Sequence, residues 1–275
     1  MLSVSALNVY PVKGLKGISV TEARATERGL EHDRRWMVVD GEGDFLSQRE
    51  HPRMATIWTE IDDGRLVLSA PDRDAVEVPI DPTLRATRRV RVWSSVVDAA
   101  AVPGPASAWL SDYLGIDCAL VYMPEETERE SRPEFAGEGR LVGFADAFAY
   151  LLLGEASLAD LNARLLAKGH KPLPMNRFRP NLVVSGGAAY AEDTWGDVQV
   201  GDALLRTAKA CGRCQVTTTD QATGEVRGPE PLATLSSYRN HPEYGPLFGM
   251  NLVTLQAGTV RVGDIVDPLD PHRRP

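Results

Sequence analysis

Hydrophobic and polar positions alternate along the first hundred residues in short runs that are rich in β-branched side chains. Runs of this kind predict strands, because successive side chains of a strand face opposite sides of a sheet. The predicted strands are residues 4–10, 18–25, 36–40, 56–61, 66–69, 76–80 and 89–92. Turn signals such as Gly-Glu-Gly-Asp at 41–44 and Asp-Asp-Gly at 62–64 separate them. Short strands at this spacing predict an antiparallel barrel or sandwich.

The middle of the chain changes to helical spacing. Residues 105–114 carry an apolar stripe that stops at Gly115. Residues 157–168 predict the clearest helix, with Ser157 as its N-terminal cap. Residues 124–140 between these helices are charged and poor in apolar side chains. This composition predicts a mobile surface loop and a boundary between two domains.

Beyond Arg179 the pattern returns to strands. The predicted strands are residues 181–185, 198–200, 204–208, 215–219, 252–254, 260–262 and 265–266. Gly201-Asp202 and Gly263-Asp264 predict two matching hairpin turns. The predicted fold is therefore mainly β with few helices, in the α+β class.

Composition limits the function classes. The chain has 275 residues with 43% hydrophobic and 25% charged, as in soluble globular proteins. Its net charge of −8, without a run of Lys or Arg, disfavours nucleic-acid binding, which requires phosphates to be neutralised. No apolar run approaches the roughly 18–20 residues of a membrane span. Residues 1–16 lack the basic and apolar regions of a signal peptide. We therefore expect a cytoplasmic protein with no membrane span and no nucleic-acid partner.

The chain has three cysteines, Cys118, Cys211 and Cys214. An odd, small number disfavours a disulfide framework, and an iron–sulfur cluster usually needs more thiolates than this chain offers. Cys211-Gly212-Arg213-Cys214 is the only paired motif. A structural zinc site would need further ligands at paired spacing, and the five histidines are scattered.

Three interpretations of the paired cysteines stay open from the residues alone. A thioredoxin-like dithiol would begin a helix, whose N-terminus activates the thiol, but residues 215–219 favour a strand. The plainest alternative is a pair of small residues in a tight turn. The third is a metal site, because an arginine between two thiols favours the thiolate form, which soft or high-valent metals bind.

Basic residues also occur in turn-like or strand-edge surroundings, at Lys13, Arg34 and Arg179. Taken singly, each is more often a surface charge than a ligand contact. Together they would suit a bound anion, because Arg makes directed bidentate contacts and Lys acts as a point charge. The spacing does not show whether the three side chains converge.

Several motifs in succession resemble the MOSC family. Tyr10-Pro-Val-Lys-Gly-Leu-Lys-Gly17 and Asp33-Arg-Arg-Trp-Met-Val-Val-Asp40 resemble its N-terminal β-barrel domain, and residues 154–162 resemble its central helix. The MOSC domain itself is matched by Phe178-Arg-Pro-Asn-Leu-Val-Val-Ser-Gly186, Tyr190-Ala-Glu-Asp-Thr-Trp195, Cys211-Gly-Arg-Cys214 and Pro246-Leu-Phe-Gly249. The resemblance covers nearly the whole chain and points to the amidoxime-reducing components and their bacterial relatives. It implies an N-terminal β-barrel-like domain at residues 1–125 and a MOSC β-barrel domain at residues 126–275.

The resemblance also implies a molybdenum cofactor of the Mo-molybdopterin type, with Cys214 as catalytic residue and ligand to the metal. Implied cofactor contacts fall on Lys13, Arg34, Asp146, Arg179, Asn181, Arg213 and Asn251. The role of Cys211 is left open. The chain departs from its relatives at Gly14 and Gly212, where Ser can occur, and at Ala147 and Phe148, which replace small hydroxyl residues.

The implied activity is the two-electron reduction of N-hydroxylated substrates such as amidoximes and hydroxylamines. Some bacterial relatives carry a C-terminal ferredoxin domain that this sequence lacks, so we expect a separate electron donor, either a ferredoxin or a haem or flavin reductase. Two alternatives stay open. One is a cofactor carrier related to the C-terminal domain of molybdenum-cofactor sulfurases. The other is a binding domain that has lost its cofactor.

Overall fold

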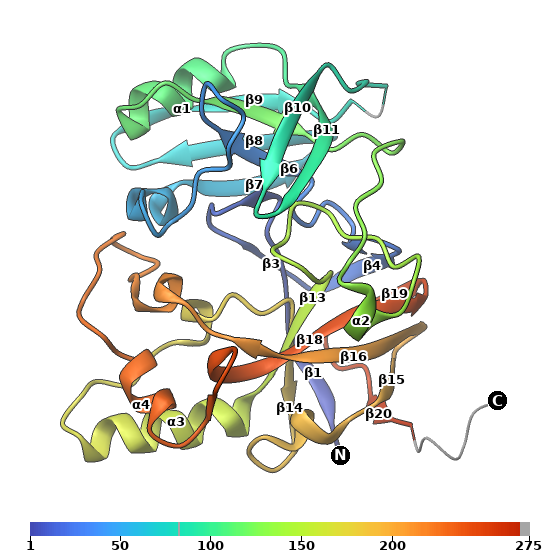
Figure 1. The fold of residues 1–275 in the computed structure, drawn as a ribbon, viewed down its shortest axis with the longest axis vertical. Coiled ribbons are helices and arrows are strands. Elements are labelled where there is room, and N and C mark those ends of the chain that lie inside the picture. Colours follow the sequence, from blue (N-terminus) through green and yellow to red (C-terminus); the bar gives the residue numbers. More distant parts are fainter. Residues whose placement is uncertain (82, 270–275) are drawn as a thin grey trace.

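The computed structural model describes residues 1–81 and 83–269, and its largest sheet forms the lower half of the molecule in Figure 1. In spatial order this sheet contains β20 (Val266–Pro268), β15 (Asp197–Val200), β16 (Ala203–Gly212), β18 (Gly245–Gln256), β13 (Tyr150–Gly154), β14 (Leu182–Ser185), β1 (Ser3–Val9) and β3 (Ile18–Val20). The short β17 (Asn240–His241) pairs with β18. Most of its pairs are antiparallel, and β13 pairs with β14 in parallel.

The upper half contains two further sheets (Figure 1). One runs β10 (Arg88–Val92), β11 (Ser95–Ala101), β12 (Ala119–Tyr122), β6 (Trp36–Val39) and β2 (Val12–Lys13). The other contains β7 (Trp58–Asp62), β8 (Arg65–Ala70) and β9 (Arg73–Pro79). A small sheet of β19 (Gly258–Arg261), β4 (Glu22–Thr26) and β5 (Gly29–Leu30) lies beside the lower half.

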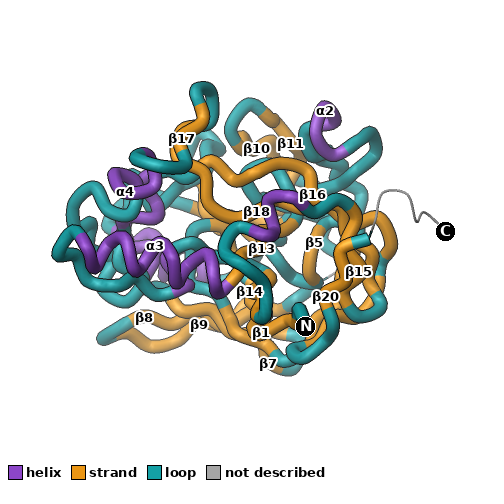
Figure 2. The backbone as a smooth tube through the Cα atoms, turned by 90° about the horizontal axis from the view of Figure 1, so that it is seen from below, coloured by secondary structure: helices purple, strands orange, loops and turns teal. Residues whose placement is uncertain are grey.

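Helices are few, which confirms the prediction of a mainly β fold. The α-helices of the described residues are α1 (Ala106–Leu114), α2 (Pro133–Ala136), α3 (Glu155–Ala167) and α4 (Leu232–Ser236). Short 3-10 helices are η1 (Pro52–Thr56), η2 (Met175–Arg177), η3 (Ala191–Thr194) and η4 (Gln215–Thr218). Figure 2 shows α3 and α4 side by side at one edge of the lower half. In the part of the chain that the structure describes, no helix is long and apolar enough to span a membrane.

One predicted strand is wrong in a place that matters for the cysteines. The sequence predicts a strand at residues 215–219, but the 3-10 helix η4 begins directly after Cys214. The hydroxyl of Thr217 donates to the carbonyl oxygen of Cys214 at 2.9 Å, and the hydroxyl of Thr218 donates to that of Gln215 at 2.8 Å. These local bonds favour a tight turn over the β propensity of threonine. No strand at these positions therefore disfavours a thioredoxin-like dithiol.

The predicted surface loop at residues 124–140 is also wrong in part. Arg129 is buried, with 6% of its surface exposed. Its guanidinium donates to the carbonyl oxygens of Gly143 at 2.7 Å, Ala145 at 2.6 Å and Asp146 at 2.7 Å. Residues 124–140, which their charge would place on the surface, thus support the loop of residues 143–146 through Arg129.

Smaller corrections concern turns and caps. Ser157 does not cap α3, which begins after Gly154; its buried hydroxyl donates to Glu192 Oε1 at 2.7 Å. The hairpin predicted at Gly201-Asp202 is confirmed, because β15 pairs with β16 across it. The one predicted at residues 263–264 is wrong, because β19 pairs with β4 and β20 pairs with β15. The predicted strand 18–25 is divided into β3 and β4.

The first strands of the chain connect the two halves. β1 lies in the lower sheet between β14 and β3, whereas β2 pairs in parallel with β6 of the upper sheet. Tyr10 and Pro11 therefore cross from one half to the other. The division into domains at residue 125 stays a prediction, and β1, β3 and β4 pair with strands that lie beyond it in the sequence.

We expect Leu7→Ala to lower the free energy of unfolding by about 2–5 kcal/mol, the usual cost of truncating a buried leucine. Leu7 is fully buried in β1, within the core of the lower sheet. Leu166→Ala on the exposed face of α3 is the matched control, with 58% of its surface exposed, and should change the value by less than about 0.5 kcal/mol. Urea unfolding of both variants measures this, and equal losses would contradict the placement of β1.

Candidate functional site

A cavity lies between the two halves and is lined by residues of both. The upper half contributes residues of the segments 45–49 and 93, and the lower half contributes residues of 145–151, 178–181 and 211–216. Each predicted site residue lines this cavity: Lys13, Arg34, Asp146, Arg179, Asn181, Arg213, Cys214 and Asn251. The fold thus brings together side chains from positions scattered over most of the chain.

Tyr10 organises two of the arginines. The guanidinium carbon of Arg34 lies 4.2 Å from the centre of the Tyr10 ring, and that of Arg179 lies 4.4 Å from it. Both arginines have left-handed backbones, with φ of +49° and +57°. Non-glycine residues seldom adopt this conformation, which recurs at functional sites. The aromatic ring attracts both cations and fixes their side chains beside the cavity.

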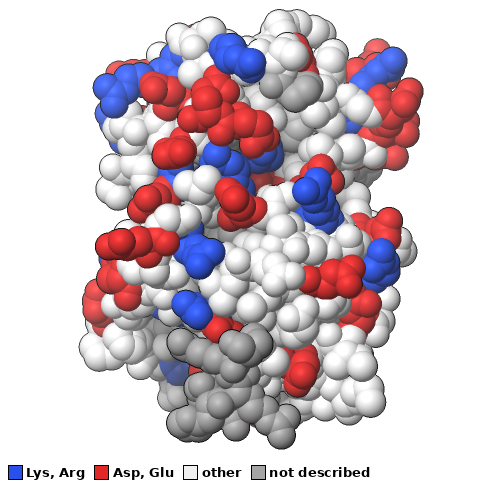
Figure 3. Space-filling model, turned by 90° about the vertical axis from the view of Figure 1, so that its right-hand side faces the viewer, with Lys and Arg blue, Asp and Glu red and all other residues white. Residues whose placement is uncertain are grey.

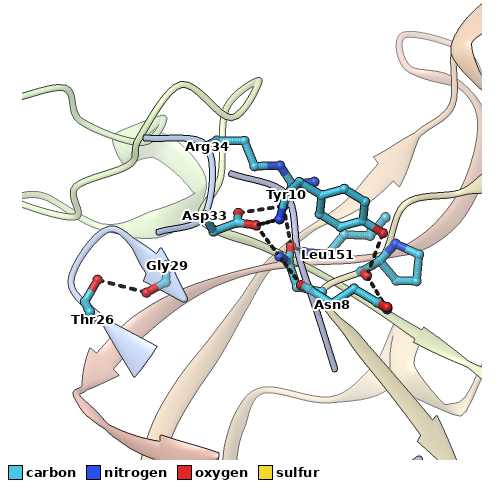
Figure 4. A network of polar contacts seen from close by, with 9 residues as sticks. Asn8, Tyr10, Thr26, Gly29, Asp33, Arg34 and Leu151 are labelled. Carbon is cyan, nitrogen blue, oxygen red and sulfur yellow. Dashed lines mark hydrogen bonds and ion pairs between the residues drawn. The ribbon is translucent and has the colours of Figure 1, made fainter. Parts of the chain in front are cut away.

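A buried network centred on Asp33 holds this arrangement (Figure 4). Its carboxylate accepts hydrogen bonds from Arg34 Nη1 at 2.6 Å, from the backbone N–H of Tyr10 at 2.8 Å and from Asn181 Nδ2 at 2.9 Å. Burial raises the pKa of the Asp33 carboxyl group, against the opposing charge of Arg34. The three donors come from both halves of the molecule, so this carboxylate links them.

Asn181 has little hydrogen-bonding capacity left for a ligand. Its amide oxygen accepts from Arg34 Nη1 at 2.9 Å and from the backbone N–H of Leu151 at 3.2 Å. Its amide nitrogen donates to Asp33 and to the carbonyl oxygen of Asn8 at 3.0 Å. Although Asn181 lines the cavity, these contacts favour a positioning role over the direct cofactor contact that the resemblance implies.

Lys13 and Asp146 form an ion pair at the cavity wall. The same carboxylate oxygen also accepts from the indole N–H of Trp93 at 3.0 Å. Burial lowers the pKa of Lys13, and Asp146 partly offsets that effect. Desolvation by the surrounding protein would raise the pKa of Asp146, although 65% of its side chain is exposed; the charge and hydrogen bond of Lys13 outweigh this effect and hold the pKa well below its usual range. The ion pair and the indole hydrogen bond fix Lys13, Asp146 and Trp93 relative to one another.

Arg213 lines the cavity together with Cys211 and Cys214. Its Nη1 donates to Cys211 Sγ at 3.0 Å, and its Nη2 donates to the carbonyl oxygen of Phe178 at 2.7 Å. Its Nε is buried without a hydrogen-bond partner among the described residues. A buried donor of this kind usually has a partner, so a bound group with an acceptor atom would complete its surroundings.

Cys214 reaches the cavity as a free thiol at the start of η4, and Cys211 is free as well. Within the described residues, no cluster of three or more His, Cys, Asp or Glu side chains could hold a metal ion. A metal bound at Cys214 must therefore bring most of its ligands with it. This condition fits a metal carried by an organic cofactor better than a metal ion held by protein side chains.

The cavity is more basic than the chain that encloses it. Lys13, Arg34, Arg179 and Arg213 line it, whereas Asp146 is the carboxylate at its wall. Burial lowers the pKa of Arg179 to about 10, which leaves it charged at neutral pH. A set of desolvated guanidinium groups binds phosphate with directed hydrogen bonds. On the face shown in Figure 3, by contrast, acidic and basic side chains are interspersed.

Several residues of the site are not among those that the sequence predicts. Tyr10 and Asp33 lie within the motifs that identified Lys13 and Arg34, and those motifs were the available signal. Gln221 accepts from Arg179 Nη1 at 3.3 Å and donates to the buried Gln48 at 2.8 Å. No local pattern marks these glutamines, because they meet across 173 positions of sequence.

Comparison with known proteins gives two family matches. The model of the MOSC N-terminal beta barrel domain matches residues 1–117, and that of the MOSC domain matches residues 140–267. The chain is 37% identical to mitochondrial amidoxime-reducing component 1 of Mus musculus, over 96% of this chain and 81% of that protein. It is 36% identical to the Homo sapiens component 1, over 96% and 82%, and 34% identical to the Rattus norvegicus component 2, over 96% and 82%.

We expect Asp33→Asn to lower the free energy of unfolding by about 3–5 kcal/mol. The substitution leaves the partly buried Arg34 without its counter-charge and turns an amide N–H toward one of the three donors. Glu77→Gln, in the exposed Arg65–Glu77 pair, is the control and should cost less than about 1 kcal/mol. Urea unfolding at neutral pH compares them. A loss as small as the control's would show that the network does not hold the halves together.

The buried phenol of Tyr10 predicts a pH dependence in the alkaline range. Burial raises the pKa of Tyr10 to about 12, although Arg179 and Arg34 oppose this. The unfolded chain releases the phenolic proton near pH 10, so the contribution of Tyr10 is complete below pH 10 and is lost as pH rises to about 12. Wild type should thus lose roughly 2–3 kcal/mol more than Tyr10→Phe between these values, measured by urea unfolding. Parallel curves would contradict the assignment.

Proposed function

The chain belongs to the MOSC-domain family that includes the amidoxime-reducing components, and on this premise we propose that it is a molybdenum-cofactor-dependent reductase of N-hydroxylated compounds. The observation that carries the proposal is the convergence of Cys214 and the basic side chains on one cavity between the halves. The relatives' names describe reduction of amidoximes, and we propose the same activity for this chain.

The cavity fits an anionic metal cofactor in three respects. Lys13 and Arg179, which are both desolvated, and Arg34 supply positive charge for a phosphate. The unpaired Nε of Arg213 offers a donor near the cysteines. Cys214 offers one thiolate where no protein metal cluster exists among the described residues. We propose that Cys214 is the ligand to molybdenum and that Arg213 and Asn251 line the pterin, with Asn181 positioning Arg34.

The cofactor, when bound, would supply two-electron redox chemistry and the remaining sulfur ligands of the metal. The chain's own residues bind and orient it. Phe148, Leu151 and Phe178 line the same cavity and reduce the access of water to it. The ion pair of Lys13 with Asp146 places a fixed dipole at the wall.

The overall reaction consumes two electrons and two protons for each N–OH group, which leaves as N–H and water. We propose that a separate protein, a ferredoxin or a haem or flavin reductase, supplies the electrons. The substrate is a small molecule that carries the N-hydroxyl group. The support for this assignment is the family of the chain together with its cavity.

Metal analysis tests the ligand. Protein purified from a host that makes the cofactor should contain stoichiometric molybdenum, and Cys214→Ser should lose nearly all of it, because serine is a poor ligand for a soft metal site. Cys118→Ser is the matched control: Cys118 is buried near Ser111, away from the cavity, and its loss should leave the molybdenum content unchanged. Equal low metal in wild type and Cys214→Ser would refute the proposal.

Turnover separates a reductase from a cofactor carrier. With an artificial electron donor, the metal-loaded wild type should convert benzamidoxime to benzamidine. A protein that holds stoichiometric molybdenum yet reduces neither amidoximes nor hydroxylamines would be a carrier. The two measurements together distinguish loss of the metal from loss of the reaction.

A further inference from the structure

Trp93 occupies an unusual place in the fold. Val92 of β10 pairs with Ser95 of β11, so Trp93 and Ser94 form a two-residue hairpin turn. Trp93 has a φ of +55°, in the left-handed region that favours glycine or asparagine, and 39% of its surface is exposed. A bulky aromatic residue at such a position is strained, and strain of this kind tends to persist where it serves function.

The indole is nonetheless fixed on its cavity side. Its N–H donates to Asp146 at 3.0 Å, and its ring meets Phe45 edge-on, with centroids 4.8 Å apart. The guanidinium carbon of Arg49 lies 4.4 Å from its ring centre. These contacts join an exposed aromatic residue to the Lys13–Asp146 pair and hold it at the edge of the cavity.

Two different walls therefore meet in this cavity. The lower half presents Cys214, Arg179 and Arg213, whereas the upper half presents the aromatic rings of Phe45 and Trp93. Lys13 Nζ lies 5.0 Å from the centre of the Phe45 ring, and the Trp93 indole donates to Asp146, so both rings also contact the polar side of the cavity. Small-molecule sites combine a few polar groups that orient the reacting end with apolar or aromatic groups that receive the rest of the ligand.

We propose that Phe45 and Trp93 are specificity-determining residues, which receive a flat aromatic ring attached to the carbon that bears the N-hydroxyl group. The site then favours aromatic over aliphatic N-hydroxylated substrates, because aromatic rings gain from edge-to-face or offset contacts that alkyl groups do not make. This inference rests on the proposed function for the identity of the reacting group, whereas the ring preference rests on the aromatic wall formed by Phe45 and Trp93.

An aromatic and an aliphatic amidoxime, compared as substrates, test the proposed ring preference. We expect Trp93→Gly to raise KM for benzamidoxime about five- to tenfold and to change KM for acetamidoxime by less than about twofold. Glycine suits the backbone at this position, so the hairpin is preserved. Trp93→Phe keeps a ring but loses the N–H bond to Asp146, and it should keep most of the aromatic preference. Phe45→Ala should act in the same direction as Trp93→Gly.

Trp58→Gly is the matched control. Trp58 is exposed to 47%, lies on β7 outside the cavity, and has Lys16 Nζ 5.2 Å from a ring centre. Its loss should alter neither KM. An equal rise of KM for both substrates in Trp93→Gly would overturn the proposal and leave Trp93 as a shield for the Lys13–Asp146 pair. If Trp93→Gly fails to fold, Trp93→Asn, which also tolerates a left-handed backbone, replaces it.

Binding of the reaction products separates this inference from the proposed function. Calorimetric titration with benzamidine and acetamidine requires no turnover. If wild type binds benzamidine more tightly than acetamidine, and this difference is lost in Trp93→Gly but kept in Trp58→Gly, the proposed ring preference is supported even if neither amidoxime is reduced. Reduction of both amidoximes with equal KM, together with equal affinity for both amidines, would contradict the proposed ring preference. The assignment as a reductase would still hold.

Discussion

The carboxylate of Asp33 is the contact on which the rest of this structure depends. It is almost completely buried and accepts from Tyr10 at the crossing between halves, from Arg34 beside the cavity and from Asn181 at the start of β14. Burial of a carboxylate is unfavourable unless its oxygens are paired and hydrogen-bonded, and here they are. Because its donors come from both halves, the same bonds that neutralise the charge also fix the relative position of the halves.

The cavity follows from that position. Tyr10, held by Asp33 through its backbone, places its ring beside the guanidinium groups of Arg34 and Arg179. Like charges at this proximity repel one another, and the two arginines also have strained backbones. A chain that concentrates strain and positive charge at one place, while its net charge is −8, resembles proteins that depart from local rules at functional sites.

The two walls of the cavity come from different halves, so neither half contains the site alone. The thiol, Arg179 and Arg213 stand on segments of the lower half, and the aromatic rings and Arg49 stand on the upper half. The loop that carries Asp146 is held by the buried Arg129, and Asp146 in turn bonds Lys13 and Trp93. A short chain of hydrogen bonds therefore connects the two walls.

The sequence by itself determined the β character, the helices around residues 105–114 and 157–168, and the identity of the chemical groups: the cysteine motif, Lys13, Arg34 and Arg179. Periodicity and short motifs encode these features, because they depend on neighbours within a few residues. Tertiary structure alone decided that these groups share a cavity, that Arg129 is buried and that Trp93 stands at the cavity's edge. The physical reason is that burial and pairing depend on partners far apart in sequence, as Asp33 and Asn181 are across 148 positions.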